Sequence, residues 1–106
     1  MNVLVLEDDE LVGELLETVI ASAYPGATVQ QFRTLEEAQA GAGRQRFELV
    51  ITDWNLPDGS GLELVRCLRE RDSELPIVMV SGRSDRESVL KAAHYGISGY
   101  ITKPFS

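Results

Sequence analysis

The chain has 106 residues, of which 43% are hydrophobic and 25% charged, and its net charge is -7 at pH 7. This length suits one domain spanning residues 1–106 with a single core, and it leaves no room for a second. The excess of acidic side chains argues against direct nucleic-acid binding, because affinity for a phosphate backbone comes from Lys and Arg. No apolar run approaches the ~20 residues that a membrane span needs, so we expect no membrane association.

The N-terminal segment and the cysteine content both indicate a cytoplasmic protein. The first apolar run, Val3–Leu6, is ended by Glu7-Asp8-Asp9, too early for the hydrophobic region of a secretory signal. Cys67 is the only cysteine, so it forms no internal disulfide and no metal cluster. We expect a reducing environment and an ordinary helical position for Cys67.

Short aliphatic or β-branched runs alternate with segments of helical periodicity along the whole chain. The predicted strands are residues 3–6, 28–32, 49–52, 77–80 and 99–102, each of strand length. Helices are predicted over 11–23, over about 34–42, from an N-cap at Ser60 through Leu68, and from Ser84 to a stop at Gly96. Such alternation forces parallel strands, because each helical crossover returns the chain to the same end of the sheet. The pattern predicts an α/β fold.

Polar side chains follow four of the five predicted strands. They are Glu7, Asp8 and Asp9 after the first strand, Asp53 after the third, Ser81-Gly82 after the fourth and Lys103-Pro104 after the fifth. In parallel sheets, ligands bind beyond the carboxyl ends of the strands. We therefore expect carboxylates, a hydroxyl and an ammonium to meet at one edge of the sheet.

This combination favours a divalent cation and a phosphoryl group. Two carboxylates 4 Å apart repel by about 4 kcal/mol at an effective dielectric of 20, and a cation removes that repulsion. An all-oxygen site favours Mg²⁺, with Mn²⁺ as an alternative. Lys103 and Ser81 are suited to bind phosphoryl oxygens, and Asp53 is suited to attack phosphorus and carry the group as an aspartyl phosphate.

Four segments together resemble one known family. They read LVLEDDE, ITDWNLPDGSG, PIVMVSGRSD and GYITKPF, each at a predicted strand end. In this order they resemble the receiver domain of two-component response regulators, similar to the chemotaxis receiver, from Val3 to Phe105. The resemblance implies a flavodoxin-like, doubly wound, five-stranded parallel sheet with strand order 2-1-3-4-5.

The resemblance also implies a role for each residue of the acidic site. Asp53 takes the place of the phospho-acceptor, and Glu7 and Asp8 that of the acidic pair that organises Mg²⁺. The main-chain carbonyl of Asn55 takes the place of a further metal ligand. Lys103 matches the invariant lysine of the family.

Further positions match the residues that respond to phosphorylation in the family. Ser81 matches the Ser or Thr switch residue, and Tyr100 matches the aromatic switch residue. Gly82 lies where the family tunes the lifetime of the phosphoryl group. The peptide bond between Lys103 and Pro104 is usually cis in the family.

By this resemblance the protein is a regulatory phospho-acceptor that assists its own phosphorylation and dephosphorylation rather than an enzyme. It would accept a phosphoryl group from a sensor histidine kinase or phosphotransfer protein, with Mg²⁺, and change conformation to control an output domain or partner. Two alternatives remain open. A Mg²⁺-dependent phosphohydrolase of the haloacid dehalogenase type would use the same acids, although that family has a second Asp where this chain has Asn55. A degenerate receiver would act as a binding module alone.

Several expectations concern surfaces outside the acidic site. Asp9 is expected to cap the first helix, Trp54 to lie on the surface and His94 to lie on an exposed helix turn. Receivers normally carry a fifth helix after the KPF segment, and this sequence stops at Ser106. We expect the chain to be the N-terminal part of a longer response regulator, with an uncovered sheet face that favours a homodimer.

Overall fold

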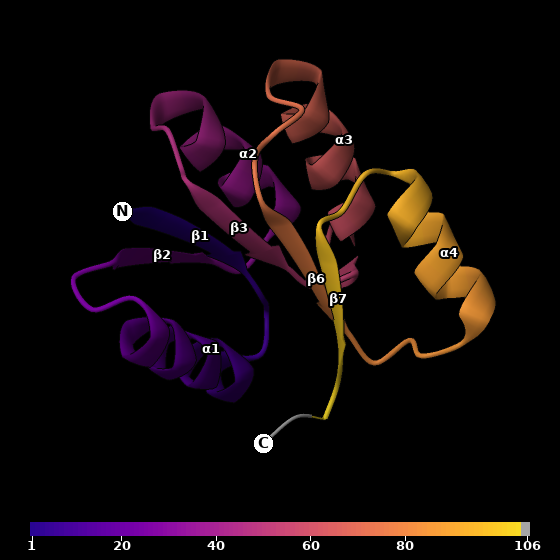
Figure 1. The fold of residues 1–106 in the computed structure, drawn as a ribbon, viewed down its shortest axis with the longest axis horizontal. Helices are drawn as coiled ribbons and strands as arrows, with labels where there is room; N and C mark the ends of the chain where they lie inside the picture. Colours follow the sequence, from indigo (N-terminus) through magenta and orange to yellow (C-terminus); the bar gives the residue numbers. More distant parts are fainter. Residues whose placement is uncertain (105–106) are drawn as a thin grey trace.

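The computed structural model describes residues 1–104 and contains a five-stranded parallel sheet with strand order β2-β1-β3-β6-β7 (Figure 1). Its strands are β1 (Asn2–Leu6), β2 (Thr28–Phe32), β3 (Leu49–Thr52), β6 (Ile77–Ser81) and β7 (Gly99–Thr102). The helices between them are α1 (Glu10–Ala23), α2 (Leu35–Arg44), α3 (Gly61–Arg71) and α4 (Arg86–His94). The predicted fold class and strand order are confirmed. Phe105, the last residue of the resemblance, lies outside the described residues, and no helix among those described could span a membrane.

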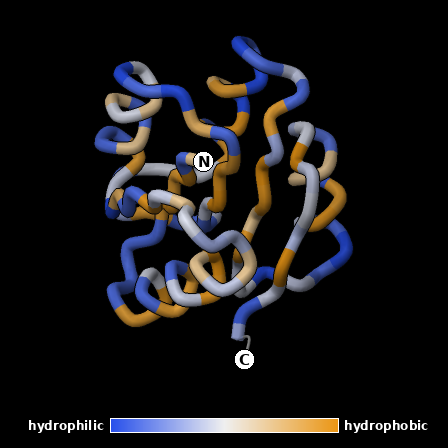
Figure 2. The backbone as a smooth tube through the Cα atoms, turned by 60° about the vertical axis from the view of Figure 1, so that its left-hand side comes forward, coloured by the Kyte–Doolittle hydropathy of each residue, from blue (hydrophilic) through white to orange (hydrophobic). Residues whose placement is uncertain are grey.

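Side chains of alternating residues in the central strands build a separate core on each face of the sheet, as the two-residue period of a strand requires. Leu4 and Leu6 of β1 belong to the larger core, which α2, α3 and α4 cover. Val3 and Val5 belong to the smaller core, where Leu16 of α1 packs. Figure 1 shows α1 on the opposite side of the strands from α2 and α3. Figure 2 shows the hydrophobic residues concentrated along the strands and the hydrophilic ones in the loops.

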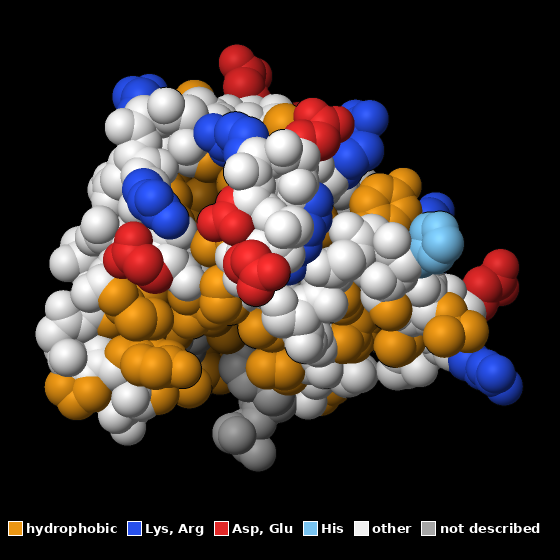
Figure 3. All heavy atoms as spheres, turned by 45° about the horizontal axis from the view of Figure 1, so that its top comes forward, with side chains coloured by type: hydrophobic (Ala, Val, Ile, Leu, Met, Phe, Trp, Pro, Cys, Tyr) orange, Lys and Arg blue, Asp and Glu red, His pale blue; other side chains and the backbone are white. Residues whose placement is uncertain are grey.

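The face that α1 covers keeps several hydrophobic side chains in contact with solvent. Leu11 is 77% and Val19 is 52% exposed on α1, and Ile101 of β7 is 45% exposed. Ile101 pairs in register with Val80, which belongs to the core beneath α1, so both side chains point to the same face. In Figure 3 hydrophobic side chains gather along the lower edge of the molecule and charged ones above them.

A polar side chain caps the N-terminus of each helix. Asp9 accepts a hydrogen bond from Leu11 N at 2.9 Å, which confirms its predicted capping role. The other caps are Thr34 for α2, Ser60 for α3 and Asp85 for α4. The predicted start of the fourth helix at Ser84 is two residues too early, because the carboxylate of Asp85 accepts the hydrogen bond from Ser88 N and the helix begins at Arg86.

The segment after β3 forms a short hairpin. Its strands are β4 (Asn55–Leu56) and β5 (Gly59–Ser60), which pair antiparallel. Gly61 then begins α3, and its N–H donates to the Trp54 carbonyl at 2.7 Å. A Cβ on Gly61 would lie 1.9 Å from the main-chain oxygen of Asp53. Only glycine permits this close approach, which places the start of α3 directly against the Asp53 segment.

Candidate functional site

Asp53 lies at the carboxyl end of β3, and its side chain is held at both oxygens. Oδ1 accepts a hydrogen bond from Trp54 N at 2.6 Å, and Oδ2 accepts one from Lys103 Nζ at 3.0 Å. Only 8% of the residue surface is exposed. The hydroxyl of Thr52, which is buried, donates to the Asp53 carbonyl and supports the main chain at this point.

Two acidic residues from the end of β1 complete a carboxylate cluster with Asp53. One oxygen each from Glu7, Asp8 and Asp53 lie within 4.8 Å of one another. Glu7 is 3% exposed, whereas Asp8 is exposed to solvent. The parallel pairing of β1 with β3 brings these residues together, because Leu6 lies beside Thr52 in the register. The predicted convergence of the strand ends is thus observed.

Lys103, which follows β7, pairs with two of these carboxylates. Its Nζ lies 2.7 Å from Glu7 Oε1 and 3.0 Å from Asp53 Oδ2. Burial by itself lowers the pKa of Lys103, but its hydrogen bonds and charge interactions with Glu7 and Asp53 outweigh burial and raise that pKa above its ordinary value. The peptide bond between Lys103 and Pro104 is cis, as predicted.

The pKa of the buried Glu7 carboxylate is raised above its ordinary value, because the effect of burial exceeds that of its favourable contacts. Burial raises its pKa most, the contacts with Lys103 and Asp9 N lower it, and the charge of Asp53 raises it further. Its Oε1 is buried and receives no hydrogen bond of good geometry from residues 1–104, although Lys103 Nζ is close. One buried and one exposed acid beside Asp53 form an oxygen donor set that fits a partly hydrated Mg²⁺ or Mn²⁺ ion.

Of the two predicted switch residues, Ser81 is the last residue of β6, whereas Tyr100 lies within β7 and pairs in register with Met79. Ser81 is completely buried, and its Oγ accepts a hydrogen bond from Arg83 N at 3.1 Å. Tyr100 is half-buried, and its hydroxyl donates to the Arg83 carbonyl. Gly82 between them is exposed, and a Cβ there would meet open space.

Two side chains near the site differ from expectation or were missed. Trp54 was expected on the surface but is only 5% exposed, because its ring packs in the larger core and beneath the Arg83 guanidinium, 4.6 Å from the ring centroid. Arg83 did not figure among the predicted site residues. It also donates to the side-chain oxygen of Asn55 at 3.0 Å. The sequence could have indicated Arg83 as a residue near the site, because it directly follows Ser81-Gly82.

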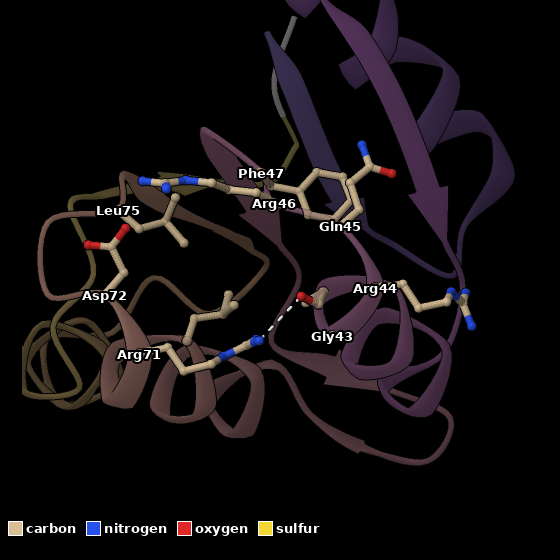
Figure 4. A pocket seen from close by; sticks show the side chains of 10 residues that line it. Gly43, Arg44, Gln45, Arg46, Phe47, Arg71, Asp72 and Leu75 are labelled. Carbon is tan, nitrogen blue, oxygen red and sulfur yellow. Dashed lines mark hydrogen bonds between the residues drawn. The ribbon is translucent and has the colours of Figure 1, made fainter.

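A cavity of about 540 Å³ lies away from this site. Its lining comes from the C-terminal ends of α2 and α3 and from the loops that lead from them into β3 and β6, and it includes Arg46, Phe47, Arg71 and Leu75 (Figure 4). Those loops enter the strands at their amino ends, opposite to the end that carries Asp53. Figure 4 shows Arg71 bonded to a main-chain oxygen, that of Ala42. The cavity is therefore separate from the acidic site.

Comparisons with known proteins agree on one family. The model of the response regulator receiver domain matches residues 3–106. The chain is 34% identical over 104 residues to the KDP operon transcriptional regulatory protein KdpE of Escherichia coli, covering 98% of this chain and 45% of KdpE. It is 40% identical over 62 residues to the chemotaxis protein CheY of Pseudomonas aeruginosa, covering 57% of this chain and 50% of CheY. The matches thus span about half the length of these relatives.

A solved structure gives the same result for the fold. The non-phosphorylated receiver domain of HemR from Leptospira biflexa superimposes with a TM-score of 0.88 at 28% identity, covering 99% of this chain and 83% of that one. The family match, the similarity to KdpE across 98% of this chain and the shared fold are independent of the distances around Asp53. Together they place this chain in the response regulator receiver domain family of two-component systems.

Proposed function

We propose that Asp53 is the phosphoryl acceptor of this receiver domain and that a sensor histidine kinase or phosphotransfer protein is the donor. The observation that carries this proposal is the position of the Asp53 carboxylate between Lys103 Nζ, at 3.0 Å, and the acids Glu7 and Asp8. A carboxylate beside both a fixed ammonium and a cation site can approach phosphorus without unbalanced negative charge. The new bond forms between an Asp53 oxygen and phosphorus as the bond from phosphorus to the donor histidine breaks.

The residues that would hold Mg²⁺, or Mn²⁺, are Glu7, Asp8, Asp53 and the main-chain carbonyl of Asn55. A bound divalent cation would neutralise charge on the phosphoryl oxygens. Asp8 is exposed, so it can be reached by a hydrated ion. Glu7 is buried and orients the site through its contacts with Lys103 and Asp9 N.

Lys103 and the switch residues supply the remaining contacts. Lys103 donates from the side of β7 and offsets negative charge during transfer. Ser81 then donates its hydroxyl to the phosphoryl group, and Tyr100 turns inward, which shifts an equilibrium between two conformations. The exposed Gly82 leaves the approach to Asp53 open and thereby affects the lifetime of the phosphoryl group.

The domain is proposed to act inside a longer regulator. Support comes from KdpE, of which the matched segment is 45%. In that arrangement the phosphorylated surface near α4 and β7 would contact an output domain or a partner protein. Receiver domains are regulatory, and the acid cluster assists the domain's own phosphorylation and dephosphorylation rather than multiple turnover of a substrate.

The proposal is tested by incubating the protein with a small phosphodonor and Mg²⁺ and measuring intact mass. The wild type is expected to gain one acid-labile phosphoryl group, and a chelator should prevent the gain. Asp53→Ala should gain none. Asp72→Asn, which alters an aspartate outside the cluster, is the matched control and should behave as wild type. Equal labelling of Asp53→Ala would refute the assignment, and sustained hydrolysis of a phosphate ester would favour a phosphohydrolase.

A further inference from the structure

The cavity at the amino ends of β3 and β6 has an apolar floor that reaches the edge of the larger core. Its apolar lining consists of Ala42, Phe47, Leu68 and Leu75, and all four residues belong to that core. Each keeps between 6% and 9% of its surface exposed. The cavity volume of about 540 Å³ lies within the range of small-molecule sites, roughly 300–1,000 Å³.

Three arginines and one acid form the charged part of the lining. Arg44, Arg46 and Arg71 are exposed, and none of the three forms an ion pair within residues 1–104. The acid, Asp72, accepts a hydrogen bond from Glu74 N at 2.9 Å, so its carboxylate has a partner in its own loop. The positive charges of the rim are therefore available to a ligand.

Two of the arginines lie on opposite sides of the cavity. Figure 4 shows the Arg46 side chain extending toward Leu75 on one side and Arg71 on the other, whereas Arg44 points away. Within residues 1–104 the Arg71 side chain makes one hydrogen bond, from Nη1 to Ala42 O at 3.3 Å, which leaves most of its N–H groups for a ligand. Arg46 makes none in that part of the chain and lies beyond the C-cap of α2, so helix capping does not account for it.

The charge of the cavity stays positive although two helices end beside it. Three arginines and one aspartate give a net side-chain charge of +2, and the C-termini of α2 and α3 reduce it to about +1, since each contributes about -0.5 elementary charge. Carbonyls at these helix ends already accept hydrogen bonds, Ala42 O from Arg71 and Leu68 O from Asp72 N. A positive cavity in a chain of net charge -7 selects for an anion.

We propose that this cavity is a second binding site, separate from the acidic cluster, and that it takes an aromatic carboxylate. The ring packs against Phe47, Leu68 and Leu75. The carboxylate binds between Arg46 and Arg71, because a guanidinium donates two parallel hydrogen bonds to a carboxylate and also stacks on aromatic faces. Burial of the ring supplies affinity, and the arginines select the charge and the orientation of the ligand.

The test uses 2-naphthoate as the probe and follows the backbone amide signals of the intact chain by NMR. We expect saturable binding with a dissociation constant of about 1 mM or below, which the size of the probe supports. The largest shifts should occur at residues 42–47 and 71–75, which line the cavity. Two control probes are 2-naphthylmethylamine, which carries a cation on the same ring, and inorganic phosphate, which has no apolar part. Both should bind at least about tenfold more weakly than 2-naphthoate.

Substitutions of the two arginines test their assigned role. Arg46→Met should weaken the binding of 2-naphthoate about tenfold or more, because a charge-assisted hydrogen-bond partner is lost while the apolar stem remains. Arg71→Met should act in the same direction. Arg66→Met is the matched control, because Arg66 is an exposed arginine of α3 outside the cavity lining, and it should bind as wild type does. Circular dichroism establishes that each variant is folded.

Several outcomes would overturn this site. They are a wild type that does not bind 2-naphthoate, equal binding of either control probe, and unchanged binding by both Arg46→Met and Arg71→Met. Loss of binding in Leu11→Ser/Val19→Ser together with full binding by Arg46→Met would place the probe on the exposed face of α1 and also overturn the site. No phosphoryl transfer enters these measurements, so each of these outcomes leaves the proposed function intact.

Discussion

Lys103 Nζ lies 2.7 Å from Glu7 Oε1, although the two residues come from opposite ends of the chain. The ammonium stands at the end of β7, the carboxylate at the end of β1, and Asp53 Oδ2 is 3.0 Å from the same nitrogen. One cation therefore balances two nearly buried anions. This arrangement makes the site depend on Lys103 for stability as well as for chemistry.

Removing the ammonium group of Lys103 should destabilise the protein when no metal ion is bound. We expect Lys103→Met to lower the free energy of unfolding by ~1–3 kcal/mol, because Glu7 and Asp53 lose their common partner. Mg²⁺ should restore part of the loss by replacing the charge. Urea denaturation with and without Mg²⁺ measures both effects, and Lys91→Met on exposed α4 is the control. Unchanged stability of Lys103→Met would show that the pair contributes little.

Gly61 should not tolerate a side chain. A Cβ there would lie 1.9 Å from the Asp53 carbonyl and 2.7 Å from Thr52 Oγ1, so we expect Gly61→Ala to cost at least ~3 kcal/mol of stability and to impair phosphorylation. Gly43→Ala is the matched control. A Cβ at Gly43 meets nothing within 4 Å, and alanine should stabilise α2 by ~0.5–1 kcal/mol.

Gly61→Ala and Gly43→Ala are compared by urea denaturation followed at Trp54. A Gly61→Ala protein as stable as wild type would mean that α3 can move away from Asp53. In that case the phosphorylation rate would show whether the altered start of α3 changes the position of the acceptor.

Asp58 should make stability depend on acidic pH. Its carboxylate accepts hydrogen bonds from Leu35 N at 2.8 Å and Glu36 N at 2.9 Å, 23 and 22 residues away, and these bonds lower its pKa. An acid whose pKa is lower in the folded state stabilises the protein above its unfolded value, here 3.8, and the contribution disappears as pH falls through the lower folded pKa.

The variant that tests this is Asp58→Ala. It should be less stable than wild type at neutral pH, and the difference should vanish in strong acid. Thermal unfolding from pH 2 to 7 follows the difference, with Glu70→Ala, an exposed acid on α3, as the control. A difference that is constant across this range would mean that the ionised carboxylate does not cap α2.

The exposed hydrophobic side chains of α1 should promote self-association, as expected for the less covered face of the sheet. Leu11 and Val19 are more than half exposed on one helix, and burying such side chains against a second copy is favourable. We expect a concentration-dependent sedimentation coefficient that falls toward the monomer value in Leu11→Ser/Val19→Ser. Glu14→Ser, on the same helix, is the control. A strictly monomeric wild type at high concentration would contradict the homodimer.

Local sequence patterns were sufficient to predict the α/β fold class and the members of the acidic cluster, whereas the strand order came from the resemblance to receiver domains. A strand period of two and a helix period of 3.6 follow from the spacing of apolar residues alone, and parallel strands carry the residues at their carboxyl ends to one edge. Glu7, Asp8, Asp53, Ser81 and Lys103 therefore needed no knowledge of long-range contacts to be placed together. The capping role of Asp9 could also be predicted from the sequence, because Asp9 bonds to a main-chain N–H only two residues away.

Other features depend on contacts between residues that are distant in the sequence, and only the tertiary structure decided them. Trp54 is buried because the larger core and the Arg83 guanidinium cover it. Asp58 caps α2 from a hairpin more than twenty residues away. Arg83 connects the Asp53 segment to Ser81 and Tyr100. No periodicity specifies such contacts, because they arise where separate elements pack together.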